Sequence, residues 1–235
     1  MQQEIGEAIC HAIGSQLGWQ IPRSFDAEDG LRWIGANMVK VTSWDQLNEP
    51  YGKGYHVLEI GANLKPQANL IWPHARITYL DIDPEFKPDI VADAAHLPGN
   101  LAGKFDAIFS SHVLEHFSYR DTVDVLVGWG KCLKKCGRVV TIVPSLEWAA
   151  KEIMTGNPSP VVWPHLFAGN SSQYDHHLNG FTQQSLKLDF EKAGYEIDFL
   201  GWSEYYLREY NYEGKGFGEA HLAEQHIIKA TWKGI

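Results

Sequence analysis

The stretch His56-Val57-Leu58-Glu59-Ile60-Gly61-Ala62-Asn63 decides how the chain folds. Its first five residues favour a buried strand, and this strand runs directly into a glycine at which the backbone can turn tightly. Twenty residues beyond that glycine, an apolar run ends in Asp81, and the short run that follows ends in Asp93. A strand, a glycine turn and acids after the next two strands form the pattern by which an α/β protein binds an adenosine ligand.

The composition is that of a globular protein. The chain has 235 residues, of which 44% are hydrophobic and 21% are charged, and this length suits one α/β domain with a sizeable core. The net charge of −9 argues against a general nucleic-acid binder, because such a protein needs a basic surface. Every apolar run is shorter than the roughly 18 residues of a membrane span, so we expect no membrane partner.

The amino terminus and the cysteines indicate a cytoplasmic protein. Residues 1–4 lack the charged-then-apolar order of a secretion signal. The three cysteines, Cys10, Cys132 and Cys136, do not provide the two pairs of a typical zinc site. We therefore expect free thiols in a reducing compartment.

Strands and helices alternate along most of the chain. The apolar runs predict strands at about 55–60, 76–82, 89–92, 105–110, 139–143, 195–202 and 225–232, and the main helices at 120–135 and 183–193, the latter capped by Thr182. This alternation predicts a Rossmann-like, doubly wound, seven-stranded and mostly parallel sheet.

Two further segments surround or interrupt this core. An apolar stripe at helical spacing in residues 3–18 predicts a helical extension, so we divide the chain into an extension at 1–54 and a ligand-binding domain at 55–235. Residues 145–180 form an insertion rich in Trp, His, Pro and Asn, and a loop of this length is usually functional. The aromatic residues of 202–218 fit a lid, core packing and a dimer surface equally well.

The strand ends assign a nucleoside site. Gly61 lacks a side chain and lets a ligand approach the backbone. Asp81 can accept both hydroxyls of a ribose, while Asp93 can accept from an adenine amino group above which Ala94 packs. A dinucleotide site needs further glycines that Ala62 to Pro66 do not supply, which disfavours NAD and FAD. S-adenosylmethionine carries no phosphate and makes fewer demands on this turn.

These residues resemble the class I S-adenosylmethionine-dependent methyltransferases. The resemblance covers about residues 55–200 and includes six motifs: Val57-Leu58-Glu59-Ile60-Gly61-Ala62, Leu80-Asp81-Ile82, Ala92-Asp93-Ala94-Ala95-His96-Leu97-Pro98, Phe105 to Phe117, Leu133-Lys134-Lys135-Cys136-Gly137-Arg138, and Asn179-Gly180-Phe181-Thr182. The sequence departs from the family in two places. The first motif has Asn63 and Lys65-Pro66 instead of its usual later glycines, and the turn before the fifth strand has Lys135-Cys136 where proline and glycine are usual.

The resemblance implies a methyl transfer from S-adenosylmethionine to a small polar acceptor, such as a hydroxyl of a sugar or another metabolite. It implies that the cofactor contacts Glu59, Gly61, Ala62, Asn63, Asp81, Ile82, Asp93, Ala94, Ser110 and His112. A homodimer is compatible with it, whereas a nucleic-acid partner is not expected. The alternatives are a non-catalytic nucleoside-binding module, favoured by the atypical turn after Gly61, and a dinucleotide-dependent oxidoreductase.

The histidines raise two further questions. Transfer to a hydroxyl needs a base, and the Asp-His-His run in the insertion makes His176 or His177 the candidate. The segment His112-Val113-Leu114-Glu115-His116 spells an inverted zinc-protease signature, but it follows a buried strand, where the methyltransferase resemblance explains it. For His116 we expect a structural hydrogen bond. No spacing rule supports a metal site at His165, His176 and His177, so we predict no metal.

Overall fold

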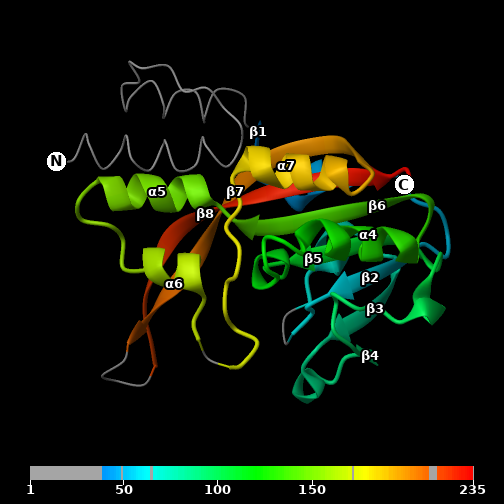
Figure 1. Ribbon diagram of the computed structural model, residues 1–235, viewed down its shortest axis with the longest axis horizontal. Helices are drawn as coiled ribbons and strands as arrows, with labels where there is room; N and C mark the ends of the chain where they lie inside the picture. Colours follow the sequence, from blue (N-terminus) through cyan, green and yellow to red (C-terminus); the bar gives the residue numbers. More distant parts are fainter. Residues whose placement is uncertain (1–38, 49, 64–65, 171, 212–215, 235) are drawn as a thin grey trace.

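The computed structural model describes residues 39–234 except 49, 64–65, 171 and 212–215. Its core is an eight-stranded sheet in the order β1-β7-β8-β6-β5-β2-β3-β4 (Figure 1). The strands are β1 (Val39–Lys40), β2 (His56–Ile60), β3 (Arg76–Asp81), β4 (Ile90–Val91), β5 (Phe105–Ser111), β6 (Leu133–Pro144), β7 (Tyr195–Asn211) and β8 (Gly216–Trp232).

The sheet is mostly parallel, as predicted. Strand β8 is the exception, because it lies antiparallel between β6 and β7. All seven predicted strands are present, and β1 adds an eighth at the edge beside β7. The sequence analysis missed β1 because two residues are too short for an alternating pattern to be visible.

Helices cover both faces of the sheet. The α-helices are α3 (Ala68–Ile71), α4 (Thr122–Cys132), α5 (Leu146–Met154), α6 (Val162–Phe167) and α7 (Gln183–Lys192). Short 3-10 helices lie at η1 (Trp44–Gln46), η2 (Pro84–Phe86), η3 (Gly99–Leu101) and η4 (Leu114–His116). Helices α4 and α7 pack on one face of the sheet, and α3 packs on the other.

The alternation of side chains along each strand builds the two cores. On β2, Leu58 and Ile60 join the cluster under α4 and α7, while Val57 joins the cluster under α3. On β5, Ile108 and Phe109 divide in the same way. Because successive side chains of a strand point to opposite faces, the apolar runs of the sequence supply both cores at once.

The insertion at 145–180 is more ordered than a loop. It contains α5 and α6, and both pack with Ala223 and Tyr205 of the long β7–β8 hairpin, which extends past the parallel part of the sheet (Figure 1). The aromatic segment at 202–218 forms much of this hairpin. The last residues of the insertion lie against the segment after β5, because the amides of Leu178 and Asn179 donate to the carbonyl of Glu115.

Several element boundaries differ from the prediction. Helix α4 ends at Cys132, because Leu133 is already extended and opens β6. Lys134 forms an ion pair with Asp106 on β5 at 2.7 Å, so this lysine belongs to the sheet rather than to a helix end. The strands predicted at 195–202 and 225–232 are both longer, with 17 residues each.

The predicted extension at 1–54 lies outside the described residues up to residue 38. From residue 39 onward it contributes β1 and η1. The division into an extension and a 55–235 domain therefore stays a prediction. Among the helices of the described residues, none combines the length and the apolar character that a membrane crossing demands.

Two glycines in α4 provide a matched test of the packing. A Cβ atom on Gly130 would lie 2.3 Å from the Trp232 ring, whereas one on Gly128 would meet nothing within 4 Å. We expect Gly130→Ala to lower the free energy of unfolding by about 1–3 kcal/mol through overpacking. Gly128→Ala should raise it by about 0.5–1 kcal/mol because alanine favours a helix. Urea denaturation of both variants measures this, and equal effects would contradict the packing described.

Candidate functional site

The site lies at the carboxyl ends of β2, β3 and β5, and Glu59 organises its first turn. The Glu59 side chain is buried, and its two oxygens accept hydrogen bonds from the backbone amides of Gln67 (2.6 Å) and Ala68 (3.1 Å) at the start of α3. Burial raises the pKa of Glu59, although these amide hydrogen bonds oppose the rise. Glu59 thus links the end of β2 to the start of α3 and stabilises the turn between them.

Gly61 is the residue at which the turn can be approached. Its φ is +69°, and its amide donates to the carbonyl of Leu80 on the neighbouring strand. A Cβ atom at this position would lie 2.3 Å from Cγ2 of Val113. Glycine is therefore required both by the left-handed backbone and by the close contact with the segment after β5.

Asp81 is fixed at the end of β3. Its side chain is buried, and its oxygens accept from the backbone amides of Asn63 (3.1 Å) and Asp83 (3.0 Å). Each carboxylate oxygen can accept more than one hydrogen bond, so both keep capacity for a ribose hydroxyl. A pocket of about 90 Å³ adjoins Asp81 and is lined also by Ala62 and Asn63. The residues present therefore fit the nucleoside part of a cofactor.

The other predicted cofactor residues differ in their exposure to solvent. Asp93 is exposed and accepts from the amide of Ala95, while Ala94 is buried and accepts from the indole of Trp129 through its carbonyl. Ile82 follows Asp81 and is 37% exposed. Ser110 is fully buried with its hydroxyl 2.9 Å from that of Thr141, so its side chain supports the site from within the sheet.

His112 begins the second half of the site. Its φ is +55°, and its Nε2–H donates to Oε1 of Gln225 on β8 at 2.9 Å. Its Nδ1 lies 3.4 Å from Oε1 of Glu115. Burial alone would lower the pKa of His112, but Glu115 and Gln225 raise it overall, and His112 in turn lowers the pKa of Glu115 against the effect of burial. Each of the two side chains therefore favours the charged form of the other.

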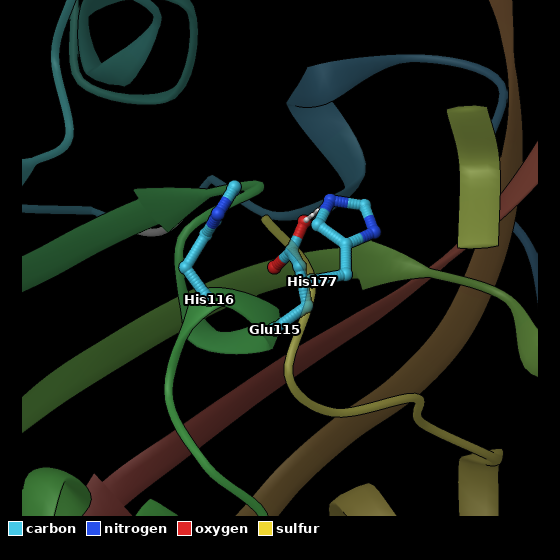
Figure 2. Close-up of side chains that lie close together, drawn as sticks. All are labelled: Glu115, His116 and His177. Atoms are coloured by element: carbon cyan, nitrogen blue, oxygen red, sulfur yellow. Dashed lines mark ion pairs between the residues drawn. The ribbon is translucent and has the colours of Figure 1, made fainter. Parts of the chain in front are cut away.

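Glu115, His116 and His177 form a compact group, here named the acid–histidine cluster. Glu115 and His116 come from η4 and His177 comes from the insertion, and the three side chains lie close together (Figure 2). Nε2 of His177 lies 3.8 Å from Oε1 of Glu115, and the two rings meet edge to face at 4.9 Å. Burial lowers the pKa of His177, although the charge of Glu115 opposes this.

Backbone hydrogen bonds hold the insertion against η4. The carbonyl of Glu115 accepts from the amides of Leu178 (2.9 Å) and Asn179 (3.1 Å). His116 Nδ1–H donates to the carbonyl of His176 at 3.0 Å, which is the structural hydrogen bond expected for His116. The same ring also lies beside Glu115 and His177, and this was not predicted from the sequence.

The two predicted base candidates differ in their surroundings. His176 is exposed and its Nδ1–H donates to the side chain of Asn170 at 2.5 Å, so its ring points away from the cluster. His165 does not join His177 in a metal site either, because both of its nitrogens are engaged: Nε2–H donates to the carbonyl of Ser145 and Nδ1 accepts from Tyr205. Burial lowers the pKa of His165 to about 4.

Comparison with known proteins decides the family. The model of the methyltransferase domain matches residues 39–199, which is more than half of the chain. The chain belongs to this methyltransferase family. The assignment confirms the resemblance derived from the sequence and replaces the two alternatives, the oxidoreductase and the non-catalytic module. The comparison with curated proteins gave no match.

Solved structures share the fold of this methyltransferase. A protein from Bacillus halodurans assigned as a methyltransferase is 15% identical with a TM-score of 0.59, over 82% of this chain and 97% of its own. A protein from Methanosarcina mazei is 13% identical with a TM-score of 0.57, over 84% and 100% of the two chains. One from Listeria monocytogenes is 12% identical with a TM-score of 0.53, over 80% and 95%. These likenesses confirm the Rossmann-like fold.

The sequence analysis missed the contribution of the hairpin to the site. Gln225 holds His112, and Tyr205 packs on the His112 ring at 4.9 Å and bonds to His165. Both residues are more than 90 positions away from His112, and neither belongs to a motif. The sequence signal for this region was the His-x-x-Glu-His spacing, and the structure places His112 beside Glu115 at this spacing.

The placement of Asp81 leads to a binding prediction. We expect Asp81→Asn to weaken the binding of S-adenosylmethionine by about 10- to 100-fold, because hydrogen bonds to a charged acceptor contribute about 1.5–3 kcal/mol. Isothermal titration calorimetry measures this. Asp83→Asn is the matched control, since asparagine can replace the helix cap that Asp83 provides to Glu85. An equal loss in both variants would contradict the role of Asp81.

Proposed function

We propose that this methyltransferase transfers the methyl group of S-adenosylmethionine to a hydroxyl of a small polar acceptor, such as a sugar or another metabolite. The observation that carries the proposal is the contact between the two halves of the site. Val113 touches Gly61 in the cofactor turn and lies two residues before Glu115 in the acid–histidine cluster. A nucleoside bound at Asp81 and an acceptor bound at the cluster would thus be neighbours.

S-adenosylmethionine is the cofactor expected of this family, and it supplies an electrophilic methyl group on a sulfonium. In the proposed arrangement Asp81 holds the ribose, and Asp93 and Ala94 hold the adenine. Gly61 to Asn63 and His112 border the methionine part. Binding both reactants in line is the main source of rate acceleration in such a transfer. The buried walls around Glu115 and Phe181 support it by excluding water.

His177 is the better of the two base candidates. Its Nδ1–H donates to the carbonyl of His165 at 3.1 Å, so the neutral ring carries its lone pair on Nε2. Burial lowers the pKa of His177, which favours the neutral ring that can accept the proton of a hydroxyl. The exposed His176 offers no comparable atom to the cluster. In this proposal its carbonyl orients His116 instead.

The acceptor class can be tested by measuring S-adenosylhomocysteine formation with matched acceptors. We expect turnover with monosaccharides, nucleotide sugars or hydroxylated metabolites, and none with their deoxy counterparts. The product is then identified by mass spectrometry. Transfer to amines or carbon atoms, with hydroxyl compounds inert, would overturn the proposal of a hydroxyl acceptor.

The roles of the two histidines can be separated by mutation. We expect His177→Gln to lower turnover by about 10²- to 10⁴-fold, the range that a positioned base contributes. Glutamine keeps a donor for the His165 carbonyl, so the fold and the affinity for S-adenosylmethionine should be retained. His176→Gln is the control and should keep wild-type turnover, because its backbone carbonyl remains. Full activity of His177→Gln would remove histidine from the mechanism.

A further inference from the structure

We propose that Glu115, His116 and His177 bind a divalent transition metal ion. One ligand atom from each residue lies within 4.8 Å of the others, and the three residues come from two segments that are hydrogen-bonded together. Figure 2 shows the carboxylate close to both rings. Ligands at about 2.0–2.2 Å from one ion lie closer together than this, and small side-chain rotations would close the difference.

Both histidines are held in the tautomer that a metal needs. His116 donates its Nδ1–H to the carbonyl of His176, and His177 donates its Nδ1–H to the carbonyl of His165. Each ring therefore keeps the lone pair of Nε2 for another partner. Metal-binding histidines almost always donate their second nitrogen to a carbonyl or a carboxylate in this way. Two independent backbone carbonyls produce the same arrangement here.

Glu115 supplies the second observation. Its side chain is 1% exposed, and neither carboxylate oxygen has a hydrogen-bond partner in the described part of the chain. A buried carboxylate without such a partner carries a large desolvation cost. The pairing with His112 at 3.4 Å offsets part of it through Oε1 and leaves Oε2 for a cation. His112 would then support the ligand from the outer shell, as ligating carboxylates commonly require.

The ligand set indicates the class of ion. Two imidazoles and one carboxylate suit zinc or a similar first-row ion, whereas magnesium and calcium prefer oxygen ligands only. Three protein ligands also leave at least one coordination position open. A cavity of about 10 Å³ adjoins Glu115 and His177, which is about the volume that one water molecule requires.

The role of the ion in methyl transfer rests on the proposed function, whereas its binding does not. An acceptor hydroxyl in the open position would lose its proton more easily, because a bound divalent ion lowers the pKa of a coordinated oxygen. Nε2 of His177 would then be a ligand and would act through the metal rather than as the base itself. The methyl group would pass from sulfur to the metal-bound oxygen, and the proton would leave to solvent.

The test is a calorimetric titration of chelator-treated protein with zinc chloride. We expect one zinc per chain, and little heat with magnesium chloride. The variants Glu115→Gln, His116→Gln and His177→Gln should each weaken zinc binding by more than about 100-fold, the upper end of the cost of losing an outer-shell partner. Circular dichroism and S-adenosylmethionine affinity show whether each variant is folded.

The control is the double variant His74→Gln, Cys136→Ser, which removes an exposed imidazole and an exposed thiol away from the cluster. It should bind zinc as the wild type does. Zinc affinity unchanged in the three cluster variants, or lost in the control, would overturn the metal site.

Activity of the chelated protein separates this proposal from the proposed function. If zinc binds at the cluster, turnover on a hydroxyl acceptor should fall at least tenfold on chelation and return with zinc. If turnover persists unchanged without metal and still requires His177, the metal proposal fails and the histidine base stands. If S-adenosylmethionine binds but no hydroxyl acceptor reacts with or without metal, the proposed function fails, while zinc binding stands on calorimetry.

Discussion

The close contact between Gly61 and Val113 is the constraint on which the rest of the site depends. A side chain at residue 61 would overlap Val113, so the segment after β5 can lie against the cofactor turn only if that turn has no Cβ atom. This contact fixes η4 relative to β2. Through η4 it also fixes the backbone carbonyl that anchors the insertion. One missing methyl group thus sets the distance between the two halves of the site.

The second half of the site places an ionisable carboxyl group and several histidines in a buried environment, where charged groups are normally rare. Glu115 is buried beside His112, His116 and His177. The pairing with the carboxylate raises the pKa of His112, whereas burial lowers the pKa of His177. Groups in one cluster that are pushed apart in this way are typical of functional sites. The sheet alone does not require this arrangement, since Glu115 adds desolvation cost rather than packing.

Much of the fold could be predicted because its signals are local. The apolar runs ending at Gly61, Asp81 and Asp93 predicted the positions of the strands in the cofactor half. Thr182 predicted the start of α7, where it accepts a capping hydrogen bond from Ser185. The rest could not be predicted because it depends on contacts between distant segments. The hydrogen bond between His112 and Gln225 is one example, and the different surroundings of His176 and His177 are another. In both cases residue type is visible in the sequence, but the direction of the side chain is not.

The position of β8 has a consequence for how the protein is made. The sheet order places β8 between β6 and β7, and β1 joins the sheet beside β7. The first described strand is therefore linked to the parallel core through the last two strands of the chain. During synthesis, β1 has no sheet partner until β7 has left the ribosome, and β7 joins the parallel core only through β8. Strand β1 can therefore pair only after the distant strand β7 has been made, and such long-range pairing makes folding slow.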